Sequence, residues 1–154
     1  MKFEYMYTFG LPRKMVWRWL KDVNVLKNSI TGCKSFSETK PGVYNGVIDI
    51  GVGAINDSFR LEVQRIQEKK PSFYRLYVKG SGNLGNIEAK VDLDLHEMPG
   101  ACKLNLHADV SVDGALVVAA EHVLNGFASK GIERFFLRID KEIRKSIYKT
   151  RNGQ

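Results

Sequence analysis

The sequence has little of what metal centres, disulfide scaffolds and membrane spans require. Among its 154 residues are only two cysteines, Cys33 and Cys102, which lie far apart and belong to no CxxC pattern. This usage argues against a metal cluster or a disulfide scaffold and favours free, buried thiols. The best apolar run, Leu116 to Ala120, is far too short to cross a bilayer. The first residues alternate polar and apolar types, unlike a secretory signal, so we expect a soluble, cytoplasmic protein.

The motifs of common enzyme classes are missing as well. There is no HExxH, GxSxG or phosphate-loop pattern, and the glycine-rich stretch at 80–85 precedes a predicted strand instead of a helix. The sequence has three histidines. His96 and His107 fall on the outer face of the predicted sheet, and His122 stands alone beside the apolar stripe of the last helix. We therefore predict no catalytic residue, no metal site and no cofactor.

What the chain does contain is the composition of one folded domain. Apolar residues make up 44% and charged residues 27%. We expect residues 1–148 to form the domain and residues 149–154 to be a frayed tail. The net charge of +7 is uneven, because eight lysines and arginines against three acidic residues follow position 129. Such a bias suits nucleic acid, anionic lipid or an acidic partner, and also a plain solvated helix face.

Polar and apolar residues alternate along most of the chain, which is typical of half-buried strands. The first strand covers residues 2–10. Pro12 fits the first turn of a helix running to about Leu20, and Asp22 caps a second short helix that ends at Gly32. Turn residues separate six further strands, which predicts an antiparallel meander. These strands are expected at residues 33–39, 42–51, 54–67, 72–80, 86–97 and 101–112.

The register of the last hairpin follows from its pattern. Setting Val91 opposite Ala108 gathers the apolar residues of both strands on one face. The same register sets Lys90 against Asp109 on the outer face, and opposite charges stabilise such cross-strand pairs.

After Gly114 the apolar residues recur with helical spacing to about Tyr148, which predicts one helix of roughly 50 Å at 1.5 Å per residue. An antiparallel sheet must cover its apolar face, and this helix is the largest element available. We predict an α+β fold in which a curved seven-stranded antiparallel sheet wraps around the long C-terminal helix. Two short helices lie between strands one and two.

Strand alternation also predicts a cavity. The turns at 51–53, 80–85 and 112–114 share one end of the sheet and are rich in glycine, and the last helix begins there with small residues. The core is therefore expected to be open at this end, although glycines at hairpins also serve turn geometry alone. The residues expected to line the cavity are Ile50, Ile55, Asp57, Phe59, Leu76, Val78, Ala89, Val91, Ala108, Val110, Leu116, Ala120, Val123 and Phe127.

Asp57 is the unusual member of this set. Alternation from Ile55 and Phe59 turns its carboxylate inward, where a charge needs a partner, so it would orient a polar ligand head or act as a base. A bulge at the preceding glycines would instead send Asp57 to solvent. Both interpretations stay open.

Several short segments, in this order and spacing, resemble a known family. They are Met1-Lys2-Phe3, the helix start from Pro12 to Trp17, Gly32-Cys33, Gly51-Val52-Gly53, Val110 to Gly114 and Phe135-Phe136. The element order resembles the START/Bet v 1-like (SRPBCC) superfamily, whose helix-grip fold encloses a deep apolar cavity. More narrowly, the chain is similar to the CoxG family of carbon monoxide dehydrogenase subunits. It departs from that family at Thr31, where a proline is usual, and at Asp113-Gly114, where a glycine pair is usual.

The resemblance implies a non-catalytic carrier or accessory protein of a molybdenum hydroxylase of the carbon monoxide dehydrogenase type. Its ligand would be a lipid or a quinone-like molecule. Basic residues of the last helix would dock to a partner or to anionic headgroups at the inner face of the membrane. These residues are Lys130, Arg134, Arg138, Lys141 and Lys145.

Two other functions stay open. Polyketide cyclases and aromatases share this fold, and such an enzyme would need polar groups such as Asp57 and Tyr74 to converge inside the cavity. A nucleic-acid-binding module would use the basic helix instead, although the aromatic residues follow the apolar pattern and do not stand among the lysines.

Overall fold

The chain folds as a sheet of antiparallel strands that curves around a long helix. The computed structural model describes residues 1–52, 55–119 and 125–151. The order of elements is β1 (Lys2–Phe9), α1 (Arg13–Leu20), α2 (Val23–Ser29), β2 (Cys33–Lys40), β3 (Val43–Val52), β4 (Ile55–Lys69), β5 (Phe73–Gly82), β6 (Gly85–Met98), β7 (Ala101–Val112), α3 (Leu116–Ala119) and α4 (Asn125–Arg151).

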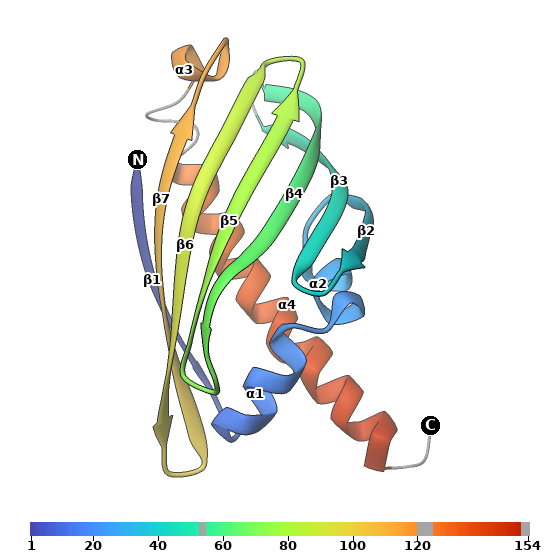
Figure 1. Cartoon of the computed structure of the whole chain (residues 1–154), viewed down its shortest axis with the longest axis vertical. Helices are drawn as coiled ribbons and strands as arrows, with labels where there is room; N and C mark the ends of the chain where they lie inside the picture. Colours follow the sequence, from blue (N-terminus) through green and yellow to red (C-terminus); the bar gives the residue numbers. More distant parts are fainter. Residues whose placement is uncertain (53–54, 120–124, 152–154) are drawn as a thin grey trace.

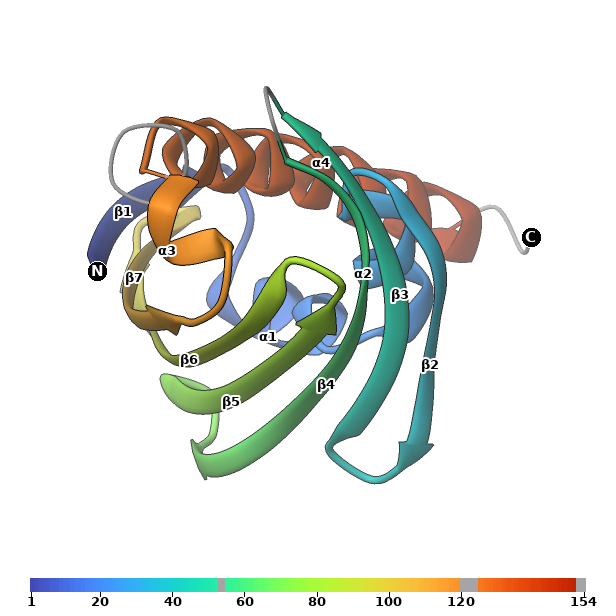
Figure 2. The same ribbon diagram turned by 90° about the horizontal axis from the view of Figure 1, so that it is seen from above.

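The strands of the described residues form one seven-stranded sheet in the order β1-β7-β6-β5-β4-β3-β2, with every neighbouring pair antiparallel. The first strand thus closes the sheet beside the last one. Seen from above, the sheet bends into an open trough and α4 lies across its open side (Figure 2). The predicted helix-grip architecture is confirmed.

The register of the last hairpin is also confirmed. Val91 lies opposite Ala108, and Lys90 lies opposite Asp109. The outer face gains a further contact because the guanidinium of Arg75 on β5 donates to the carboxylate of Asp92 at 2.6 Å. Burial on one face and charge pairing on the other therefore select the same alignment.

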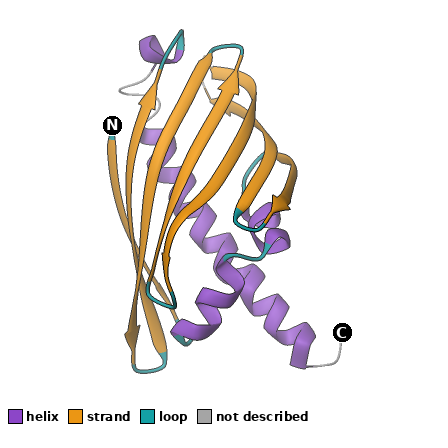
Figure 3. Cartoon of the chain, viewed as in Figure 1, coloured by secondary structure: helices purple, strands orange, loops and turns teal. Residues whose placement is uncertain are grey.

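The two short helices, α1 and α2, cover one end of the sheet beside α4 (Figures 1 and 3). Asp22 caps α2 as predicted, since its Oδ1 accepts hydrogen bonds from the N–H groups of Asn24 and Val25 at 3.0 and 3.1 Å. Helix α1 buries Val16, Trp17 and Leu20 in the main core.

Helix α4 packs on β1 in this core. Phe136 on α4 stacks on Tyr5 of β1 with ring centroids 5.6 Å apart, and Ile139 and Ile143 continue its buried stripe. Full burial of each such side chain stabilises the fold by about 1.5–3 kcal/mol.

Both cysteine thiols are free: Cys102 is buried in this core and Cys33 is half-buried. Burial raises the pKa of each.

The end of the chain differs from the single helix predicted after Gly114. The structure has a short helix, α3, and a separate long helix, α4, which do not share an axis (Figure 2). Residues 120–124 between them lie outside the described residues. Helix α3 buries Leu116 against Ile55 and Phe59 of β4, and Asn125-Gly126 has low helix propensity where α4 begins. Tertiary burial at α3 thus outweighs the continuous helical period of the sequence.

Helix α4 ends at Arg151, and the domain boundary at residue 148 stays a prediction.

Candidate ligand-binding site

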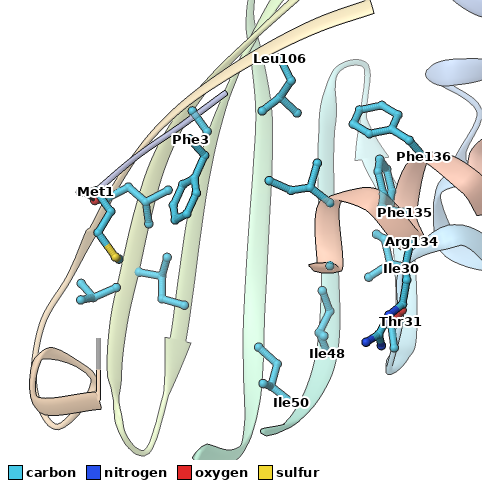
Figure 4. A pocket seen from close by; sticks show the side chains of 16 residues that line it. Met1, Phe3, Ile30, Thr31, Ile48, Ile50, Leu106, Arg134, Phe135 and Phe136 are labelled. Atoms are coloured by element: carbon cyan, nitrogen blue, oxygen red, sulfur yellow. Dashed lines mark hydrogen bonds between the residues drawn. The ribbon is translucent and has the colours of Figure 1, made fainter. Parts of the chain in front are cut away.

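A cavity of about 390 Å³ lies between α4 and the concave face of the sheet. Figure 4 shows side chains from β1, β3, β7 and α4 surrounding it. This volume falls within the roughly 300–1,000 Å³ that small-molecule pockets span. The lining residues are Met1, Phe3, Ile30, Thr31, Ile48, Ile50, Ile87, Leu106, Ala108, Val110, Val112, Gly131, Ile132, Arg134, Phe135 and Phe136.

The wall of the cavity is apolar because strand alternation points every second side chain inward. Leu106, Ala108 and Val110 follow this rule on β7, and Ile48 and Ile50 follow it on β3. Among the described lining residues, only Thr31 and Arg134 carry polar side chains. The cavity can therefore hold an apolar body and offers polar contacts at one place.

A second cavity of about 150 Å³ adjoins the first one. Ile30 and Phe135 line both, so these two side chains form the partition between them. Tyr44 and Tyr74 also face the smaller cavity. The hydroxyl of Tyr44 donates to the carbonyl of Lys21 at 3.0 Å, and burial raises the pKa of Tyr74 far above its ordinary value. Both phenols therefore stay neutral at physiological pH.

The structure distributes the predicted cavity residues over several places. Ile50, Ala108 and Val110 line the larger cavity, and Leu76 and Val78 line the smaller one. Their role in binding a ligand stays a prediction.

Three other predicted lining residues form a small core cluster of their own. Ile55, Phe59 and Leu116 are 2%, 1% and 1% exposed and pack on one another. Ile50, Ile87 and Val112, which line the larger cavity, pack against this cluster. Because Ile50 and Val112 lie at the turns at 51–53 and 112–114 and line the larger cavity, the opening expected at this end stays a prediction.

Apart from Asp57, the rest of the predicted set lies in the core or outside the described residues. Ala89 and Val91 are on the inward face of β6 but belong to the packed core and not to either cavity wall. Ala120 and Val123 lie outside the described residues, and so does the side chain of Phe127.

Asp57 faces inward, as alternation predicts, and is 8% exposed. The pairing of β4 with β3 runs without a register shift from Ile55 to Gln64. Its Oδ2 accepts a hydrogen bond from the N–H of Leu84 at 2.9 Å, and its Oδ1 accepts one from the N–H of Ser58 at 2.8 Å. The carboxylate thus fastens the turn between β5 and β6 to β4, and it lines neither cavity.

Several lining residues were missed from the sequence. Ile48 and Phe3 lie two residues from inward positions that alternation identifies, so the pattern alone could have found them. Ile30 and Thr31 belong to the turn between α2 and β2, which carries no periodic signal. Arg134 was expected on the outer face of α4 as a docking residue, and it reaches the cavity rim as well.

The other predicted docking residues are exposed on α4, and Lys145 lies 3.6 Å from Glu142. Within the described ranges, no three His, Cys, Asp or Glu side chains gather closely enough to hold a metal ion. No described helix is both long and apolar enough to span a bilayer.

The fold is shared with several solved structures. A conserved protein from Geobacillus kaustophilus is 27% identical, with a TM-score of 0.89 over 95% of this chain and 97% of its own. An aromatase/cyclase from Streptomyces is 11% identical and has a TM-score of 0.70. The match covers 96% of this chain and 95% of the aromatase/cyclase. A START superfamily protein from Mycobacterium smegmatis is 9% identical and has a TM-score of 0.68. The match covers 94% of this chain and 97% of the Mycobacterium protein. At 11% and 9% identity, the likeness shows the fold alone.

Sequence comparison is more specific. No curated protein matches the chain. A family model for CoxG, a subunit of carbon monoxide dehydrogenase, however, matches residues 9–144, which is most of the sequence. Since that match runs from the last residue of β1 into α4 and agrees with the START-like fold, the chain belongs to the CoxG family of carbon monoxide dehydrogenase subunits.

Proposed function

We propose that this protein binds a hydrophobic small molecule between its sheet and α4 and acts as a non-catalytic carrier or accessory protein. The observation that carries the proposal is the cavity of about 390 Å³, whose described walls are apolar except at Thr31 and Arg134. Small-molecule sites combine such an apolar body with a few placed polar groups.

A catalytic role has less support. The cyclase alternative needs Asp57 and Tyr74 to converge on one substrate. Asp57 instead accepts hydrogen bonds from the N–H groups of Ser58 on β4 and Leu84 in the β5–β6 turn. Tyr74 lines the smaller cavity and not the larger one. A general base must reach the proton that it abstracts within hydrogen-bond distance, directly or through one water.

The nucleic-acid alternative also has little support. Bases bound without sequence preference stack on exposed aromatic side chains. Phe136 is buried under the sheet, Phe135 is half-buried at the cavity, and Tyr148 is the exposed aromatic residue of α4 among its described side chains.

The ligand that fits best is a lipid or a quinone-like molecule, and the partner would be a molybdenum hydroxylase of the carbon monoxide dehydrogenase type. Family membership and an apolar cavity support both proposals. The exposed basic residues of α4 would face that partner or anionic headgroups, and each well-placed charge contributes about 1 kcal/mol at a membrane surface.

Mass spectrometry of organic extracts from the purified protein tests the proposal directly. We expect a stoichiometric apolar compound in the extract, and we expect the stripped protein to take up the neutral dye N-phenyl-1-naphthylamine and a short-chain quinone. A protein that is purified without any such compound and takes up neither probe would not be a carrier.

A further inference from the structure

The single charged side chain in the described lining of the larger cavity is Arg134. It lies on α4 between Gly131 and Phe135, which line the same space. Its side chain is exposed, so its guanidinium stands where the apolar wall meets water. In Figure 4, Arg134 and Thr31 lie on the same side of the cavity, across from Met1 and Phe3.

Among the described residues, no carboxylate forms an ion pair with Arg134. Other arginines, such as Arg75 and Arg144, lie 2.6 and 2.8 Å from carboxylates. No ion pair engages Arg134 within the described part of the chain. Its five N–H donors therefore remain available to a bound molecule.

Thr31 is held at this rim by the tight turn between α2 and β2. Gly32 has a φ of +75°, and a Cβ there would collide with the carbonyl oxygen of Asp49 on β3. The carbonyl of Gly32 also accepts a hydrogen bond from the N–H of Asp49 at 2.9 Å. The backbone at Thr31 is thus fixed to β3, and its hydroxyl makes no hydrogen bond to any described residue.

A planar guanidinium binds a carboxylate or a phosphate through two parallel N–H···O bonds, and it favours these anions over neutral acceptors. An apolar cavity with one such group at its rim is complementary to a single-chain amphiphile, which has one apolar tail and one charged head. The tail would occupy the apolar body, and the charged head would stay at the water boundary, where its desolvation is small.

We propose that Arg134, together with Thr31, is a head-group site, and that the ligand is a single-chain amphiphile with an anionic head, in the first place a carboxylate. This inference rests on the proposed carrier function and selects an anionic lipid over a neutral quinone. Arg134 is therefore a specificity-determining residue of the cavity, and the remaining basic residues of α4 are not.

Displacement of N-phenyl-1-naphthylamine by matched twelve-carbon ligands tests this assignment. The ratio of the Kd of dodecan-1-ol to the Kd of dodecanoate is measured for the native chain, for Arg134→Gln and for Arg138→Gln. Arg138 is the matched control, because it is exposed one turn further along α4 and does not line the cavity. We expect the ratio to fall about tenfold in Arg134→Gln, as the loss of a charge-assisted hydrogen bond predicts, and to stay unchanged in Arg138→Gln.

The outcomes separate the two proposals. If both dodecyl ligands bind and the ratio is the same in all three proteins, the head-group site is overturned while the carrier function stands. If dye, alcohol and acid all fail to bind the native chain, the carrier function itself is overturned. Dodecyl phosphate serves as a third ligand. A larger dependence on Arg134 for the phosphate than for the carboxylate supports an anion site and identifies a phosphate as its preferred head.

Discussion

The hydroxyl of Tyr7 on β1 donates a hydrogen bond to Oδ2 of Asp140 on α4 at 2.7 Å. The other oxygen of Asp140 accepts from Arg144 at 2.8 Å, so the carboxylate is held from both sides. This contact ties the edge strand of the sheet to the helix that covers it. Both elements also contribute to the lining of the ligand cavity, β1 with Phe3 and α4 with Phe136.

Replacing Tyr7 with Phe tests this connection through its pH dependence. Burial, and next the hydrogen bond to Asp140, raise the pKa of Tyr7 to about 12. A raised folded pKa means that the protonated phenol stabilises the fold, so this contribution is complete below the unfolded pKa of about 10 and is lost as pH rises toward 12. We expect Tyr7→Phe to lower the free energy of unfolding by about 0.5–1.5 kcal/mol at pH 8 and to flatten its decline above pH 10. Urea titrations at several pH values measure both effects.

Tyr5 supplies the control for that experiment. It lies on the same strand and stacks on Phe136, but its hydroxyl has no hydrogen bond to the described residues. Tyr5→Phe should change the free energy of unfolding at pH 8 far less. Equal losses in the two variants would mean that the link to Asp140 contributes nothing particular.

The sheet was predictable because its signal repeats. Alternation and charge pairing agreed on the alignment of Val91 with Ala108, and a shift of one residue would have buried Lys90. The inward direction of Asp57 follows from the same period. Its partner does not, because Leu84 lies in the turn between β5 and β6, where the alternation that identifies inward positions ends.

The division of the C-terminal segment into two helices was less predictable, because the apolar period does not mark where one helix ends. An apolar stripe of period 3.6 continues from Leu116 to Ile147, but the period carries no information about a change of axis. Arg134 lies on the polar side of this stripe, so the sequence indicates a solvent-facing residue. In the structure it lines the cavity together with Thr31 from the turn after α2, and no local pattern indicates this meeting of distant segments.

Asp57→Ala should affect stability and leave ligand binding intact. The substitution leaves the buried N–H of Leu84 without its acceptor, which costs about 1–3 kcal/mol. The affinity for N-phenyl-1-naphthylamine should change less than twofold under conditions where the variant is folded, because Asp57 lines neither cavity. Asn56→Ala is the matched control, since the neighbouring Asn56 is exposed. A variant that folds with native stability but no longer binds the dye would assign Asp57 to the site.

Gly82 should be intolerant of a side chain for the same local reason. A Cβ at Gly82 would lie 2.5 Å from Oδ2 of Asp57 and 3.0 Å from the ring of Phe59, both of which are buried. Overpacking of this kind typically costs about 1–3 kcal/mol, so Gly82→Ala should lower the urea midpoint clearly. Gly51→Ala is the comparison, because a Cβ at Gly51 meets nothing within 4 Å. Similar urea midpoints for the two variants would show that the residues around Gly82 shift to accommodate the added methyl group without a loss of stability.

The basic face of α4 can be tested against phosphatidylglycerol vesicles. Arg138 and Lys141 are exposed, and neither forms an ion pair within the described residues. At about 1 kcal/mol per charge, the double variant Arg138→Gln/Lys141→Gln should reduce vesicle partitioning roughly thirtyfold at low salt. The matched double variant Lys14→Gln/Lys90→Gln removes the same charge from elsewhere on the surface and should have little effect. If both double variants lose partitioning equally, net charge and not α4 governs the binding.

Gly131 offers a way to fill the cavity without weakening the fold. It lines the cavity from α4, and a Cβ placed on it meets nothing within 4 Å. Gly131→Leu should therefore project its side chain into the ligand space, while replacement of a helical glycine stabilises α4 by about 0.5–1 kcal/mol. We expect dye affinity to fall at least roughly tenfold, equivalent to about 1.4 kcal/mol, while the thermal midpoint is unchanged or higher.

Gly126→Leu separates these two effects. Gly126 lies on the same helix, is exposed and does not line the cavity, and a Cβ there also meets nothing within 4 Å. Its substitution should give a gain in helix stability without any loss of affinity. Because the two variants share the change in propensity and differ in where the new side chain points, a loss confined to Gly131→Leu can only arise from occupied ligand space. Undiminished binding by a stable Gly131→Leu protein would place the ligand somewhere other than between α4 and the sheet.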